Sequence, residues 1–62
     1  LRVAAALDEL PPAQRVALVL QHWHGWPLAR IAEHLERTPA AVAGLLKRGL
    51  RQLRELLSED DR

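Results

Sequence analysis

The chain contains no cysteine, methionine, tyrosine or phenylalanine, and two tryptophans are its only large aromatic residues. Without cysteine, neither a disulfide nor a thiolate metal site can stabilise it, and nothing argues against a reducing cytoplasm, where we expect it to reside. Hydroxyl side chains are equally scarce, because Thr38 and Ser58 are the only two. We therefore expect no enzyme, no metal site and no cofactor.

Long apolar runs are also missing. The uncharged run at residues 16–20 is far too short to span a bilayer, and no basic-then-apolar leader opens the chain. The sequence therefore predicts a soluble domain with no membrane partner.

What is present is a short chain of 62 residues, of which 48% are hydrophobic, mostly Leu, Val, Ala and Ile. A domain of this size removes only ~60% of its unfolded surface from water. We expect residues 1–62 to form one small, marginally stable domain. Because the sequence starts at Leu1 without Met and already has a helical pattern there, we also expect it to be a piece of a longer protein.

Prolines divide the first half of the sequence into two predicted helices. The residue before a proline is disfavoured in a helix, so Pro11 ends a first helix over residues 2–9. Pro12 is tolerated at the first position of a second helix, over residues 12–24, and Gly25 can end it in a left-handed conformation.

The second half of the sequence predicts two more helices. Pro27 precedes a third helix over residues 28–35 and offers no side-chain oxygen to cap it. Thr38 is a good cap for a fourth helix over residues 39–57, with Pro39 at the position that tolerates proline. The fold class is therefore predicted to be all-α: a small four-helix domain containing a helix-turn-helix in its second half.

Apolar residues at helical spacing give each predicted helix an inward face. The expected inward residues are Val3, Ala6, Leu7 and Leu10, then Val16, Val19, Leu20 and Trp23, then Leu28, Ile31, Ala32 and Leu35, and finally Val42, Leu45, Leu46, Gly49, Leu50, Leu53, Leu56 and Leu57. Trp26 is expected to join Trp23 in the core. Leu18 lies off the predicted face of the second helix, so it is a candidate docking residue, as is the cluster of Leu50, Leu56 and Leu57.

The outer face of the fourth helix carries small residues near its N-terminus and basic residues further along. At 100° per residue, this arc carries Ala40, Ala43, Gly44, Lys47, Arg51 and Arg54, with Arg48 at its edge. Small residues let a helix lie deep in the major groove, and cations behind them neutralise phosphates. The alternative is an ordinary solvated face, but the short helix before it favours DNA.

Three ordered motifs carry a resemblance to a known family. They are Leu10-Pro-Pro-Ala-Gln-Arg15, Gly25-Trp-Pro-Leu-Ala-Arg-Ile-Ala32, and Ala41-Val-Ala-Gly-Leu-Leu-Lys-Arg-Gly49. In order and spacing they resemble region 4 of the sigma-70 family of bacterial transcription initiation factors, within it the extracytoplasmic-function group. The resemblance covers nearly the whole chain.

The resemblance implies a domain that binds the minus-35 promoter element and docks on the beta-subunit flap of the RNA polymerase core, with an anti-sigma factor as a further possible partner. The family's DNA-contacting positions fall here on Arg37, Ala40, Ala41, Ala43, Gly44, Lys47 and Arg48. Thr38, Arg51 and, near the third helix, Arg30 complete the predicted DNA-binding set.

Two departures from the family pattern affect DNA recognition. Family members commonly have a basic residue and then Ser where this chain has Ala43 and Gly44, so we expect fewer base contacts. Pro27 and Arg30 replace the Ser and Glu of a capping box, which weakens the start of the third helix but adds a cation.

Two alternatives to a promoter-binding domain stay open. The same scaffold could be a protein-interaction module in which DNA contact has been lost. The helix-turn-helix of LuxR-type regulators matches the middle of the chain but not Leu10–Arg15 or the basic rear of the fourth helix. A metal site at His22 and His24 is disfavoured, because residues two apart on a helix diverge by about 200°.

Overall fold

The computed structural model describes the backbone of residues 2–60 and the side-chain surroundings of residues 2–58. Four helices occur in this range: α1 (Arg2–Asp8), α2 (Pro12–His22), α3 (Leu28–Leu35) and α4 (Pro39–Asp60). No strand occurs among the described residues. The predicted all-α fold class with a helix-turn-helix, formed by α3 and α4, is confirmed.

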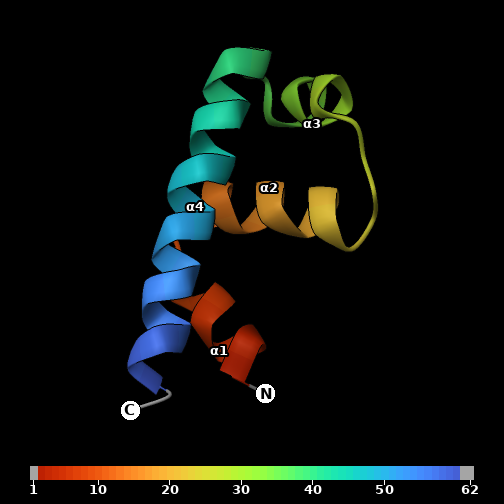
Figure 1. Ribbon diagram of the computed structural model, residues 1–62. Helices are drawn as coiled ribbons and strands as arrows, with labels where there is room; N and C mark the ends of the chain where they lie inside the picture. The colour runs from red at the N-terminus through yellow and green to blue at the C-terminus, as the bar shows by residue number, and fades with distance from the viewer. Residues whose placement is uncertain (1, 61–62) are drawn as a thin grey trace.

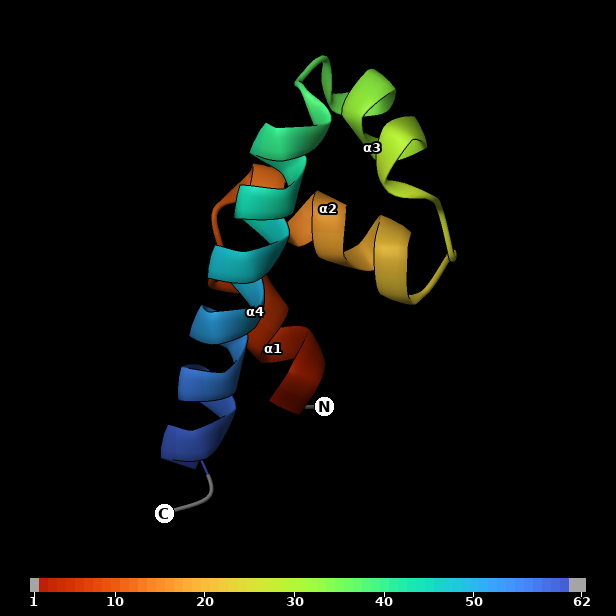
Figure 2. The ribbon, with the colours of Figure 1, turned by 45° about the horizontal axis from the view of Figure 1, so that its top comes forward.

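The long helix α4 is the spine of the molecule, and α1, α2 and α3 all lie along one side of it (Figure 1). α3 lies beside the start of α4, α2 crosses its middle, and α1 lies beside its C-terminal half, an arrangement that Figure 2 shows from a second direction. The molecule is elongated, 38 × 19 × 15 Å along its principal axes. The opposite side of α4 is left uncovered by the other helices.

Two apolar clusters hold the three shorter helices on the spine. The first joins α2, α3 and α4 through Ala17, Ile31, Ala32 and Val42, all buried. The second joins α1 and α2 through Leu7, Leu10 and Leu18, against which the α4 residues Leu46, Leu50, Leu53 and Leu56 pack. Leu46 packs against both clusters, so the two halves of the core are continuous.

The predicted inner face of α2 is wrong in part. The residues that α2 buries completely are Ala17 and Leu18, whose exposed fractions are 0% and 1%. A Cβ placed on Gly49 of α4 would lie 3.1 Å from Leu18 Cδ1, so the missing side chain of Gly49 lets α2 and α4 approach closely there. Because Leu18 fills this contact, it is not a docking residue.

Other apolar residues also lie differently from the prediction. Leu50 and Leu56 pack against the second cluster, which removes most of the predicted leucine docking surface on α4. Val3, at the start of α1, is 39% exposed rather than buried. Trp23 is 60% exposed, whereas Trp26 is partly buried against the first cluster.

The two tryptophans differ because α2 ends at His22, two residues before its predicted end. The chain then turns back, and the Trp26 N–H donates a hydrogen bond to the carbonyl of Leu20 at 3.0 Å. Gly25 has the expected left-handed conformation, with φ at +66°, but it lies in the loop after the helix end. This turn directs Trp26 toward the core and leaves Trp23 on the surface.

The last helix is longer than predicted, since α4 continues to Asp60. None of the helices in the described part of the chain is both long and apolar enough to cross a membrane.

We expect Gly49→Ala to lower the free energy of unfolding by about 1 to 2 kcal/mol, because an added Cβ meets Leu18 Cδ1 at 3.1 Å and Gln14 Cβ at 3.3 Å. Leu18 is buried and cannot easily move aside. Urea unfolding followed by circular dichroism measures the change.

Gly44→Ala is the matched control on the same helix. There the nearest atoms to an added Cβ belong to the flexible tip of Arg48, so this variant should gain up to about 1 kcal/mol from helix propensity. Equal stabilisation by both substitutions would show that the contact between α2 and α4 is not tight.

Candidate nucleic-acid interface

The turn between α3 and α4 has a fixed shape. Glu36 ends α3 in the left-handed conformation, with φ at 55°. Its N–H donates to the carbonyl of Glu33 at 3.2 Å, and the Arg37 N–H donates to the carbonyl of Ala32 at 2.9 Å. This pair of hydrogen bonds is a Schellman motif, which satisfies the last carbonyls of a helix. It directs the chain from α3 into α4 within three residues.

Thr38 fixes the start of α4, as predicted. Its Oγ1 accepts a hydrogen bond from the Ala41 N–H at 3.1 Å, and its carbonyl accepts one from the Val42 N–H at 3.0 Å. These contacts satisfy N–H groups that the first turn of a helix otherwise leaves unpaired. By contrast, Pro27 provides no side-chain cap to α3.

The face of α4 that points away from the other helices carries small residues first and cations after them. Ala40, Ala41 and Ala43 in the first turns are exposed, and so are Lys47, Arg48, Arg51 and Arg54 in the turns that follow. No acidic residue occurs in the sequence from Pro39 to Arg54. Among residues 2–58, no ion pair engages these four cations. Their charge is therefore available to a polyanion.

Gly44 differs from its small neighbours in being partly buried. The covering group is the guanidinium of Arg48, one turn further along α4. Arg48 Nη1 lies 3.3 Å and Nη2 3.6 Å from the position that a Cβ on Gly44 would take. Arg48 thus lies back along the helix toward its N-terminus, over the residue that has no side chain.

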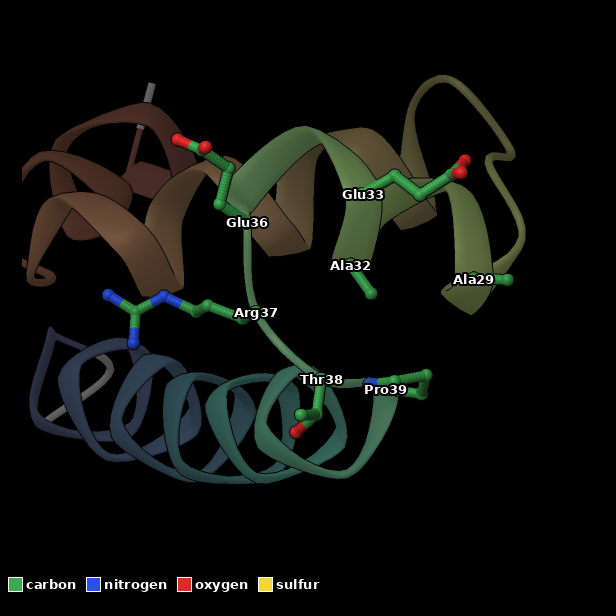
Figure 3. A pocket seen from close by; sticks show the side chains of 7 residues that line it. All are labelled: Ala29, Ala32, Glu33, Glu36, Arg37, Thr38 and Pro39. Carbon is green, nitrogen blue, oxygen red and sulfur yellow. The ribbon is translucent and has the colours of Figure 1, made fainter.

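A hollow of about 630 Å³ lies between α3 and the start of α4. Ala29, Ala32, Thr38 and Pro39 line it together with Glu33, Glu36 and Arg37 at its edge, as Figure 3 shows. In this view the side chains of Glu33, Glu36 and Arg37 extend away from the gap between Ala32 and Pro39. Two carboxylates beside the hollow disfavour a phosphate there.

Arg30, on α3, makes an aromatic contact. Its Cζ lies 3.9 Å from the centre of the Trp26 ring, a cation–π geometry, and His34 meets the same ring edge-on at 5.5 Å. The sequence signal for this contact, which we missed, is the spacing of four residues between Trp26 and Arg30 across the start of α3. DNA contact by Arg30 stays a prediction.

The structure brings nine of the ten predicted DNA-binding residues together on the turn and the first four turns of α4. These are Arg37, Thr38, Ala40, Ala41, Ala43, Gly44, Lys47, Arg48 and Arg51. Arg54, three residues after Arg51, is exposed on the same face and was not included in the predicted set. Contact of these residues with DNA stays a prediction.

Comparison with protein-family models gives a match over most of the chain. The family model described as Sigma-70, region 4 matches residues 1–53, which include α1, α2, α3 and most of α4. No curated protein matches the chain. The match covers the helix-turn-helix and every residue predicted to contact DNA.

We expect Thr38→Ala to lower the free energy of unfolding by about 1 kcal/mol, because it removes the acceptor for the Ala41 N–H. Thr38→Ser keeps that oxygen and should stay within a few tenths of a kcal/mol of the parent. Thermal unfolding followed by circular dichroism compares the three chains. A Ser variant as unstable as the Ala variant would assign the effect to the lost methyl group instead.

Proposed function

The chain belongs to the sigma-70 family, region 4, and from that premise we propose that it recognises the minus-35 element of a bacterial promoter and docks on RNA polymerase during transcription initiation. Region 4 is a DNA-binding and regulatory domain rather than an enzyme. The observation that carries the proposal is the uncovered face of α4. It carries small residues near its N-terminus and then four cations that form no ion pair within residues 2–58.

The proposed complex places the start of α4 in the major groove. The exposed methyl groups of Ala40 and Ala41 let the helix backbone approach base edges, where an Ala methyl can contact the methyl group of thymine. Lys47 and Arg51, further back, reach the phosphates on the groove walls. The Thr38 cap supports this arrangement because it holds the first turn of α4, the part that enters the groove.

We propose that the affinity of the domain for DNA comes mainly from contacts with phosphates and from tethering to RNA polymerase. Ala43 offers no polar group to a base, so sequence-independent contacts carry more of the binding energy. Docking on the beta-subunit flap holds the domain near promoter DNA and raises its effective concentration there. The extracytoplasmic-function subgroup is part of this proposal, and an anti-sigma factor is a further proposed partner.

We expect the double variant Lys47→Ala, Arg51→Ala to flatten the plot of log affinity against log salt concentration by about two units, since each neutralised phosphate contributes nearly one. Fluorescence anisotropy with a mixed-sequence duplex measures the slope, because phosphate contacts do not depend on sequence.

The control for this test keeps both charges, as Lys47→Arg with Arg51→Lys, and should leave the slope unchanged. If the neutral variant shows the parent slope, these two cations do not contact phosphates, and the proposed docking of α4 is wrong.

One observation points to a surface for the proposed docking on polymerase. Trp23 exposes 60% of its surface in the loop after α2, and tryptophan is enriched among the residues that dominate protein interfaces. This loop is far from the exposed face of α4 (Figure 1), so a protein could occupy it while DNA is bound.

We expect Trp23→Ala to weaken binding to polymerase core at least tenfold, with the free energy of unfolding changed by less than about 0.5 kcal/mol, because the side chain is mostly exposed. Pull-down with core enzyme measures the first quantity and urea unfolding the second. Unchanged binding would remove Trp23 from the docking surface.

A further inference from the structure

We propose that the loop between α2 and α3, together with the adjoining surface of α3, is a docking site for an acidic protein segment. Its carboxylates pair with Arg30, and its apolar side chains pack on Trp23. We call this surface the loop patch, and it consists of Trp23, Trp26, Arg30 and His34. The inference rests on the proposed docking function and names the chemistry of the partner. It replaces the expectation that Arg30 contacts DNA.

The loop patch is aromatic and accessible. Trp23 exposes 60% of its surface, whereas Trp26 is partly buried against the first apolar cluster. Because three residues of extended chain span at most about 11 Å, both tryptophans fit within the footprint of one bound segment. Figures 1 and 2 both show this loop on the side of the molecule farthest from α4. A partner bound there leaves the exposed face of α4 open to DNA.

Arg30 is oriented by its aromatic neighbour. Its Cζ lies 3.9 Å from the centre of the Trp26 ring, and His34 meets the same ring edge-on at 5.5 Å. A guanidinium stacked on a ring keeps the N–H donors along its edge free, and these match the two oxygens of a carboxylate. Arg30 is exposed and forms no ion pair within residues 2–58. The patch therefore presents an oriented pair of donors to an anion.

The place of Arg30 on α3 indicates that its charge serves a partner. Arg30 is the third residue of a helix that Pro27 leaves without a side-chain cap. Acidic residues stabilise the first turn of a helix and cations destabilise it, because the unpaired N–H groups there carry partial positive charge. The contact with Trp26 offsets this cost and keeps the charge. Where the family pattern has Glu, this chain therefore presents the opposite charge.

The charges around the loop patch select an acidic partner. No Asp or Glu occurs in residues 10–32, and a histidine lies on each side of the exposed tryptophan in the sequence. The α3 carboxylates Glu33 and Glu36 line the hollow beside the start of α4 instead. A DNA backbone would pair with the cation but offer no apolar surface to the indole. Tryptophan and arginine are both enriched at the energetic centres of protein interfaces, which favours a protein partner.

The test selects peptides from a displayed library of random sequences, with the 62-residue chain as bait. A prior passage over the double variant Trp23→Ala, Arg30→Gln removes peptides that bind elsewhere on the chain. Enriched peptides should contain more Asp and Glu than the starting library, together with at least one large apolar residue. Enrichment of neutral or basic peptides, or of none, would overturn the inference.

Charge reversal at Arg30 tests the pairing with the most enriched peptide. Arg30→Glu should weaken its binding at least about tenfold, because like-charge repulsion replaces a charge-assisted hydrogen bond. Arg54→Glu, at an exposed residue of α4, changes the net charge equally and should stay within about twofold of the parent. Equal weakening by both would show a general charge effect and contradict the proposed pairing.

Urea unfolding shows whether weaker binding reflects lost folding. The unfolding midpoint of Arg30→Glu should stay close to that of the parent, because the new acid favours the first turn of α3 where the contact with Trp26 is lost.

A duplex titration decides whether a protein or DNA occupies the loop patch. Arg30→Gln should leave the slope of log affinity against log salt within about half a unit of the parent for a mixed-sequence duplex. A slope flatter by about one unit would assign Arg30 to a phosphate and contradict the inference. Absence of an acidic preference leaves polymerase docking intact, whereas full binding of Trp23→Ala to polymerase core would remove the proposed docking at this loop as well.

Discussion

The close approach of α2 to α4 at Gly49 is the contact on which the rest of the structure depends. Leu18 fits against the bare backbone of Gly49, so α2 can cross the middle of α4. This crossing leaves one half of the spine for α3 and the other for α1, all on the same side (Figure 2). A bulkier residue at 49 would push α2 away and separate the two apolar clusters that it bridges. The uncovered side of α4 is thus a result of how its opposite side is packed.

Short-range signals in the sequence predicted the helices and the two faces of α4. Pro12, Thr38 and Pro39 act within one turn of the chain, so the starts of α2 and α4 could be found without tertiary information. The leucines of α4 have an unambiguous spacing, and α4 makes all of its helix contacts on that side. The ordered motifs, rather than any single residue, identified the family.

The inner face of α2 could not be predicted in the same way. Counting large apolar residues favoured Val16 and Trp23, but the deepest contact uses Leu18, because its partner is Gly49, which is 31 residues away in the chain and adjacent in space. The difference between Trp23 and Trp26 depends on one backbone hydrogen bond to Leu20, which sets where the loop turns. Likewise, the contacts of Arg30 with Trp26 and of Arg48 with Gly44 depend on side-chain conformations that residue spacing permits but does not select.

Both interior glycines of α4 lie within six residues of each other, one facing DNA in the proposed complex and the other facing α2. Each lowers intrinsic helix propensity by about 1 kcal/mol, so an isolated peptide with this sequence would be poorly helical in its middle. The order of residues 44–49 must then come from the helices docked behind them. The helical order of this stretch therefore depends on tertiary contacts, and any partner that loosens α2 would also disorder the exposed face of α4.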